Sequence, residues 1–189
     1  YGKKIIEVTR DFVEKEIKKV FTESKKENIA FLIKGDVYSA TTHIDLYLRA
    51  KKEKVPIQII PGVSILTAIG STGLSLYNFG RTLSIPFNNE NVKSIYEKFL
   101  INKKNGMHTL FLLDIQGEKM MTVKEGLSYL IKHGLSKKTT VIACGALGSN
   151  NPEIHVGAAD NVTLTKFPQC LIIPGTLNFK EEEVLELYK

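Results

Sequence analysis

Residues 29–62 read IAFLIKGDVYSATTHIDLYLRAKKEKVPIQIIPG, and this stretch decides the fold. It opens with an apolar run at 29–33, which is typical of a buried β-strand. A segment of helical period follows at 41–52, and a second apolar run at 57–60 ends in a Pro-Gly turn. This order of strand, helix and strand predicts a parallel pair with a right-handed crossover. The loops after the two strands should then meet at one edge of the sheet, where α/β proteins bind ligands.

The same alternation continues outward from this stretch. We expect a strand at 5–8 and a helix at 10–25 before it, and a helix from about residue 64 after it. The remaining expected strands cover 82–87, 109–113, 140–144, 162–165 and 170–173, and the remaining expected helices cover 92–101, 122–133 and 181–188. We therefore predict an α/β protein of two lobes. Residues 1–80 should hold a largely parallel sheet, and residues 81–189 a mixed α/β lobe.

The composition is that of a globular protein with a substantial core. The chain has 189 residues, of which 43% are hydrophobic and 24% charged. We interpret most of the formal net charge of +6 as solvated helix faces, although a basic surface also favours encounter with an acidic partner. No apolar stretch has the length of a membrane span, and the first residues do not read as a signal peptide. We therefore expect a cytoplasmic protein that binds no membrane.

Several familiar motifs are absent from the sequence. There is no GxGxxG after a strand, no GxxxxGK[ST] and no HExxH, which argues against ordinary dinucleotide, nucleoside-triphosphate and zinc-protease sites. The two cysteines, Cys144 and Cys170, form no CxxC pair, so we expect free thiols and no metal. The four histidines are scattered, and we assign no catalytic residue.

Three segments could carry chemistry, and each has a structural alternative. The loop at 35–43 enters a helix with hydroxyls and one carboxylate, which could line a pocket or only cap the helix. In the loop at 60–68, Ser64 could cap a helix or point a backbone group at a ligand. The glycine-spaced segment at 70–80 could be a hinge packed by Tyr77 and Phe79, or the floor of a substrate cleft.

The motifs GDVYSATTH, a Ser-Ile after a strand, and GLSLYNFGRTLSIPF together resemble the diphthine synthase family of tetrapyrrole-methylase-like methyltransferases. The resemblance also covers HTLFLLDI from His108 and LIIPGTLNFKEEEVLELY near the end. It implies a homodimer of two-domain α/β subunits, with S-adenosylmethionine bound in a cleft between the lobes and S-adenosylhomocysteine as product. By motif match, the residues that contact the cofactor are Asp36, Ser39, Ser64, Ile65, Leu113, Leu147, Gln169 and Cys170.

The sequence departs from the family pattern in a few places. Val37 stands where the family has a proline, and Gln169 and Asn178 stand where it has histidines. The stretch between Ile115 and Met120 is shorter than the family's basic loop. The resemblance also implies a further strand and a glycine-rich turn ahead of the position that matches Tyr1, and we expect the sequence to begin after them.

The activity that the resemblance implies is methylation of translation elongation factor 2, without direct nucleic-acid binding. The methyl acceptor would be the 3-amino-3-carboxypropyl group on a modified histidine, which leads to diphthine or its methyl ester in diphthamide biosynthesis. Methyl transfer from a sulfonium depends mainly on positioning and water exclusion, which fits a sequence without an evident catalytic dyad. The alternatives are a related tetrapyrrole or RNA methylase, and a non-catalytic binding protein of the same fold.

Overall fold

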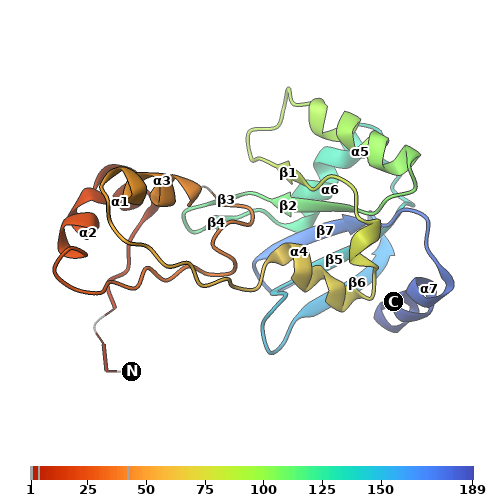
Figure 1. Ribbon diagram of the computed structural model, residues 1–189. Helices are drawn as coiled ribbons and strands as arrows, with labels where there is room; N and C mark the ends of the chain where they lie inside the picture. Colours follow the sequence, from red (N-terminus) through yellow and green to blue (C-terminus); the bar gives the residue numbers. More distant parts are fainter. Residues whose placement is uncertain (1, 4, 42) are drawn as a thin grey trace. The chain divides into compact units, whose positions relative to one another are not determined.

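The computed structural model of the chain describes residues 1–189 except 1, 4 and 42. Its contacts divide the chain into two compact units, Tyr1–Ser64 and Ile65–Lys189, which we call the amino-terminal and carboxy-terminal units. Both appear in Figure 1. The predicted α/β class is confirmed, because helices pack on a mixed sheet. No helix in the described part of the chain is long and apolar enough to cross a membrane.

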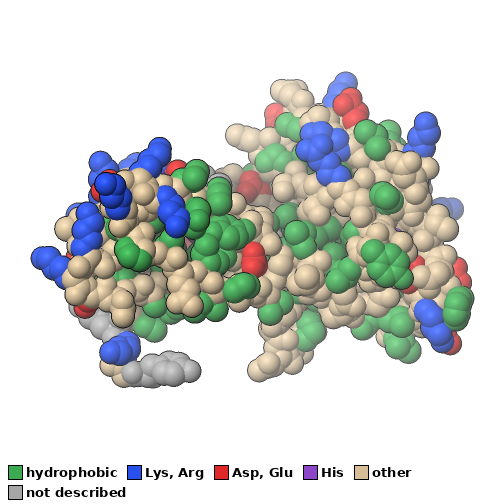
Figure 2. All heavy atoms as spheres, viewed as in Figure 1, with side chains coloured by type: hydrophobic (Ala, Val, Ile, Leu, Met, Phe, Trp, Pro, Cys, Tyr) green, Lys and Arg blue, Asp and Glu red, His purple; other side chains and the backbone are tan. Residues whose placement is uncertain are grey.

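The described residues of the amino-terminal unit form three short helices around a small core. The helices are α1 (Arg10–Lys15), α2 (Lys18–Glu23) and α3 (Ile44–Lys52). The helix that we expected at 10–25 is therefore broken into two. Its apolar positions nevertheless face inward, because Ile17 and Phe21 pack with Ala50 and Val55. The lysines of the same segment are exposed, as we expected for a solvated helix face, and cationic side chains are visible on this unit's surface in Figure 2.

The parallel sheet that we predicted for this unit is not formed in the described residues. The segments at 5–8, 29–33 and 57–60 carry no strand pairing. A parallel ladder is the weaker kind of pairing, and it occurs where both faces of the sheet are covered. Here Leu32 is 76% and Ile60 75% exposed, so one side of these segments has no covering layer.

The carboxy-terminal unit begins with α4 (Ile65–Ala68) and two 3₁₀ turns, η1 (Ile69–Thr72) and η2 (Leu76–Asn78). Its strands are β1 (Leu83–Ile85), β2 (Thr109–Leu113), β3 (Ile115–Gln116), β4 (Lys119–Met120), β5 (Thr140–Gly145), β6 (Glu153–Ala158) and β7 (Gln169–Ile173). Its longer helices are α5 (Ser94–Lys104), α6 (Val123–Lys132) and α7 (Phe179–Leu185), which a final turn η3 (Glu186–Tyr188) extends.

Five strands form one mixed sheet in the order β1-β2-β7-β5-β6. Only β1 and β2 run parallel, and the other neighbours are antiparallel. The carboxy-terminal unit is therefore a mixed α/β unit, while the lobe of residues 81–189 stays a prediction. The short strands β3 and β4 form a separate hairpin that we did not predict.

Alternation along the strands gives the sheet two apolar faces, because successive side chains point to opposite sides. On β7, Leu171 and Ile173 join the cluster beneath α5 and α6. Cys170 and Ile172 point to the other face, where they pack with η1 and α7. The result is a three-layer arrangement with helices on both faces of the sheet (Figure 1).

Two strand predictions in this unit differ from the structure. The expected strand at 162–165 is irregular, and a strand that we did not expect, β6, forms at 153–158. The backbone N–H of Thr165 donates to the Glu153 carboxylate at 2.9 Å instead of to a neighbouring strand. A side-chain acceptor thus takes the place of a ladder at this position.

The boundary between the units also differs from the one that we expected between residues 80 and 81. Residues 65–80 pack on the carboxy-terminal sheet, where Ile69 and Leu74 share an apolar cluster with Leu110 and Ile142. The contacts therefore divide the chain between Ser64 and Ile65. The division at residue 80 stays a prediction about functional lobes.

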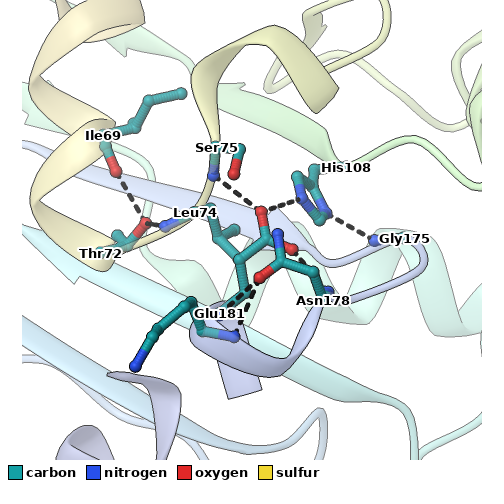
Figure 3. Close-up of polar contacts among 9 residues, drawn as sticks. Ile69, Thr72, Leu74, Ser75, His108, Gly175, Asn178 and Glu181 are labelled. Carbon is teal, nitrogen blue, oxygen red and sulfur yellow. Dashed lines mark hydrogen bonds and ion pairs between the residues drawn. The ribbon is translucent and has the colours of Figure 1, made fainter. Parts of the chain in front are cut away.

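A buried carboxylate ties distant segments of this unit together (Figure 3). Glu181 on α7 is 1% exposed. Its Oε1 accepts hydrogen bonds from the Ser75 backbone N–H at 2.8 Å and from His108 Nε2 at 3.2 Å, and its Oε2 accepts one from the Asn178 backbone N–H at 2.9 Å. The Gly175 N–H donates to His108 Nδ1 at 2.9 Å, so Nε2 carries the ring proton and donates to Glu181.

Glu181 predicts a specific loss of stability in acid. Burial raises the pKa of its carboxyl, but the hydrogen bonds from Asn178, Ser75 and His108 outweigh burial and lower the pKa from 4.5 to about 2. As the pH falls, the Glu181 carboxylate is therefore protonated in the unfolded chain before it is protonated in the folded protein. Its contribution to the free energy of unfolding is lost between pH 4.5 and about 2. The difference corresponds to about 3 kcal/mol.

Urea unfolding of the wild type and Glu181→Gln at pH 7 and near pH 2.5 measures this contribution. The stability gap between the two proteins should shrink by about 2 kcal/mol in acid. Glu182→Gln, an exposed neighbour on the same helix, is the control and should show a gap that does not change with pH. A gap for Glu181→Gln that is equally large at both pH values would contradict the assignment.

Candidate functional site

The first predicted loop is organised around the Asp36 carboxylate. Its Oδ1 accepts hydrogen bonds from the Tyr38 N–H at 2.9 Å, the Ser39 N–H at 3.0 Å and the Ser39 hydroxyl at 3.0 Å. The hydrogen bond from the Tyr38 backbone is the main cause that lowers the pKa of Asp36 below its usual value. Asp36 and Ser39, both predicted site residues, are therefore in direct contact.

The second predicted loop lies against the first. The Gly62 N–H donates to Asp36 Oδ2 at 3.4 Å. A Cβ at Gly62 would lie 2.1 Å from the carbonyl oxygen of Gly35, so only glycine allows this approach of the two backbones. Ser64 follows two residues later and is buried. The structure thus brings the two loops together, although the described residues around them do not form the sheet that we expected.

Four other predicted residues gather at one end of the carboxy-terminal sheet. Leu113 ends β2, Gln169 and Cys170 begin β7, and Leu147 follows the end of β5. The strand register places them side by side, because Cys170 pairs with Leu112 on one side and Cys144 on the other. This is also the end at which the parallel strands β1 and β2 finish, and in open α/β sheets that end binds ligands.

The apolar members of the set are packed in the protein core. Leu113 is buried in the cluster beneath α6, and its side chain occupies the space that a Cβ at Gly126 would need. Cys170 lies in the cluster on the opposite face, and Ile65 and Leu147 pack against that cluster. Both cysteines are free thiols, as we expected. The hydrogen bond with Cys170, together with burial, raises the pKa of the Cys144 thiol well above its usual range.

Gln169 is an anchor between β7 and α6. Its side-chain Oε1 accepts a hydrogen bond from the Val123 N–H at 2.8 Å, and its Nε2 donates to the Leu164 carbonyl at 3.4 Å. Val123 is the first residue of α6, and N–H groups in the first turn of a helix have no partner inside the helix. Gln169 therefore satisfies a buried helix start and holds the segment before β7.

Asn178 also departs from the family pattern, and it has a local role. Asn178 caps α7, because its Oδ1 accepts hydrogen bonds from the N–H groups of Lys180 and Glu181. His108, one of the four scattered histidines, is fully buried and bonded to Glu181. The described residues contain no group of three or more His, Cys, Asp or Glu side chains that could hold a metal ion.

The glycine-spaced segment before β1 lies at the opposite end of β2 from Leu113. The Asn78 carbonyl accepts a hydrogen bond from the His108 N–H at 3.0 Å, and the Gly80 N–H donates to the His108 carbonyl at 2.9 Å. Phe79 packs edge to face on the His108 ring, whereas Tyr77 is 85% exposed. Of our two alternatives, Phe79 supports the packed segment, and Tyr77 does not contribute to it.

Two carboxylates at the sheet end were missed by the sequence reasoning. Asp114 follows Leu113, and its Oδ2 accepts hydrogen bonds from the Phe87 N–H at 3.0 Å and from Gln116 Nε2 at 2.9 Å. Its place directly after a buried strand is a signal that could have singled it out. Glu153 at the start of β6 binds the loop before β7. No local pattern marks Glu153, because its partners lie 12 and 13 residues away.

Comparison with known proteins gives consistent results. Residues 3–163 match the family model of tetrapyrrole (corrin/porphyrin) methylases. A diphthine synthase of Methanococcus maripaludis is 40% identical over 97% of this chain and 78% of that protein. A diphthine methyl ester synthase of Candida glabrata is 48% identical over 61% of this chain and 40% of that protein. A solved structure of diphthine synthase is 26% identical with a TM-score of 0.88, and the match covers 99% of this chain and 76% of that one.

The anchoring role of Gln169 predicts a loss of stability when its polar atoms are removed. Gln169→Met keeps the length of the side chain but leaves the Val123 N–H without its acceptor. We expect the free energy of unfolding to fall by about 1–3 kcal/mol, the usual cost of an unsatisfied buried group. Urea unfolding measures it, with the exposed Gln58→Met as control. Equal stability of Gln169→Met and the wild type would show that this side chain anchors nothing.

Proposed function

Because the chain belongs to the tetrapyrrole methylase family, we propose that it is an S-adenosylmethionine-dependent methyltransferase of the diphthine synthase type. The observation that carries this proposal is the 40% identity to a diphthine synthase along 97% of the chain. The resemblance that we drew from the sequence motifs is confirmed at the level of the family. The protein is accordingly a methyltransferase, and its proposed place is in diphthamide biosynthesis.

The residues that would hold the cofactor are the eight predicted from the motifs. In the amino-terminal unit they are Asp36, Ser39 and Ser64. Asp36 suits this role, because in the described residues its Oδ2 accepts only the 3.4 Å hydrogen bond from Gly62 and keeps lone pairs for a ligand. Its lowered pKa keeps the carboxylate ionised at neutral pH. A fixed carboxylate of this kind can accept hydrogen bonds from hydroxyl or ammonium groups of a nucleoside-linked amino acid.

The carboxy-terminal unit would supply the other five residues. Ile65, Leu113, Leu147 and Cys170 offer apolar surface, and Gln169 orders the backbone beside them. When bound, S-adenosylmethionine supplies a methyl group on a positively charged sulfur. The protein's part is to bind the cofactor, to orient the acceptor in line and to exclude water.

The proposed acceptor is the 3-amino-3-carboxypropyl group on a histidine of translation elongation factor 2. Its amine receives methyl groups, and in one version of the reaction its carboxylate also becomes an ester. Matches to a diphthine synthase and to a diphthine methyl ester synthase support either product. We further propose that the protein works as a cytoplasmic homodimer, with functional lobes of residues 1–80 and 81–189, and binds no nucleic acid directly.

Calorimetric titration with S-adenosylmethionine and S-adenosylhomocysteine tests the proposal. The wild type should bind both. Asp36→Ala and Ser64→Ala should weaken binding by about tenfold or more, since each removes polar contacts in the loops predicted to hold the cofactor. Asp45→Ala and Ser128→Ala remove matched side chains on α3 and α6 and should bind like the wild type.

Methylation itself is measured by mass spectrometry on elongation factor 2 that carries the unmethylated intermediate. The target histidine should gain one or more methyl groups only when enzyme and S-adenosylmethionine are both present. A wild-type protein that binds neither nucleoside would sink the catalytic proposal and favour a non-catalytic binding protein. A pigment that copurifies and is methylated would favour a tetrapyrrole methylase instead.

A further inference from the structure

The turn that follows β5 places Leu147 between two residues with an unusual backbone conformation. Ala146 before it has φ 49° and Gly148 after it has φ 82°, so both neighbours are left-handed. A left-handed alanine is strained and persists only where its surroundings enforce it. In the part of the chain that the structure describes, the backbone N–H and C=O of Leu147 form no hydrogen bond. Both groups thus keep their hydrogen-bonding capacity for a ligand.

The neighbouring segment at 164–168 enforces this turn. The Ala146 N–H donates to the Pro168 carbonyl at 2.9 Å. A Cβ at Gly145 would lie 2.7 Å from the Lys166 carbonyl oxygen, so the two backbones are in direct contact there. The conformation at Leu147 therefore depends on where residues 166–168 lie.

Glu153 fixes the position of that segment. Its Oε2 accepts hydrogen bonds from the N–H groups of Thr165 and Lys166, both at 2.9 Å, and from the Thr165 hydroxyl at 3.2 Å. The same carboxylate stands on β6 directly opposite Gly145, the last residue of β5. One side chain thus connects the strand register to the segment that shapes the turn. The Lys166 ammonium adds a hydrogen bond to the Asn151 carbonyl at 2.8 Å.

Sequence alone gives Glu153 no role in the proposed reaction. The hydrogen bond from the Lys166 backbone is the main cause that lowers the pKa of its carboxyl, so the acceptor stays ionised at neutral pH. Next to these contacts, Gln169 Nε2 donates to the Leu164 carbonyl at 3.4 Å. Residues 164–166 are therefore held by side chains from two different strands.

We propose that Glu153 is a positioning residue for cofactor binding, which acts through residues 165–168 to hold the Leu147 backbone in its binding conformation. This inference rests on the proposed function, since it needs Leu147 to contact S-adenosylmethionine. Glu153 itself touches neither the cofactor nor the acceptor. Its effect is on affinity. Without the carboxylate the turn becomes mobile, and ordering it again on binding reduces the binding free energy.

The test compares three substitutions at Glu153 by calorimetric titration with S-adenosylhomocysteine. Glu153→Ala removes the acceptor, and Glu153→Asp keeps the charge but is one methylene too short to reach both N–H groups. Both should raise Kd about tenfold. Glu153→Gln keeps an oxygen acceptor at full length and should stay within about threefold of the wild type. Glu183→Ala, a surface carboxylate paired with Lys180, is the matched control.

Two further measurements separate positioning from a general loss of structure. Hydrogen exchange should rise in the peptide that covers residues 145–149 in Glu153→Ala and Glu153→Asp, while strands β2 and β7 keep their protection. In the methylation assay these variants should raise KM for S-adenosylmethionine and leave kcat within about twofold, since the reacting groups are untouched. If Glu153→Ala does not fold, Glu153→Asp gives the same decision.

The outcomes distinguish this inference from the proposed function. If the wild type binds and both Glu153→Ala and Glu153→Asp bind within about twofold of it, the positioning role is overturned and the methyltransferase proposal stands. If the wild type binds no S-adenosylhomocysteine, both fail together. Glu153→Gln as weak as Glu153→Ala would also overturn the role, because the acceptor oxygen would then be irrelevant.

Discussion

The buried Glu181 carboxylate is the interaction on which the carboxy-terminal unit most depends. An ionised carboxylate away from water costs several kcal/mol unless its oxygens are hydrogen-bonded, and here the donors come from three separate segments. Ser75 precedes the η2 turn, His108 leads into β2, and Asn178 caps α7. The unit must therefore bring these segments together to bury the charge. The His108 backbone in turn forms hydrogen bonds with the Asn78 carbonyl and the Gly80 N–H, just before β1 pairs with β2.

The sheet that results is a scaffold whose two ends differ. At the Glu181 end, buried polar groups form hydrogen bonds with one another, and Phe79 packs against the His108 ring and the apolar cluster. At the other end, β1 and β2 finish, β7 begins and β5 turns into a left-handed loop. Here the backbone of Leu147 forms no hydrogen bond within the described chain. In our proposal the cofactor binds at this second end, where the Leu147 backbone keeps its hydrogen-bonding capacity for a ligand.

The loops of the amino-terminal unit are shaped by contacts within and between the loops themselves, since its described residues form no sheet. Asp36 folds back on its own turn, and the contact between Gly35 and Gly62 needs only that neither neighbour carries a side chain in the way. These constraints act over short distances and persist where the longer apolar segments have no covering layer. Hydrophobic side chains are visible on the surface of this unit in Figure 2. Leu32 and Ile60, which are mostly exposed, belong to those segments.

The sequence by itself determined the family, the α/β class and most elements of the carboxy-terminal unit, since apolar period and helix caps are local. The caps Thr122 with Glu125 and Asn178 with Glu181 are examples, as each pair lies three residues apart. Only the tertiary structure decided the rest. At the expected strand 162–165, the Thr165 N–H donates to the Glu153 carboxylate and not to a neighbouring strand. Gln169 binds the first residue of α6, which lies 46 residues away in the chain. Such roles depend on which strands become neighbours, and no local pattern carries that information.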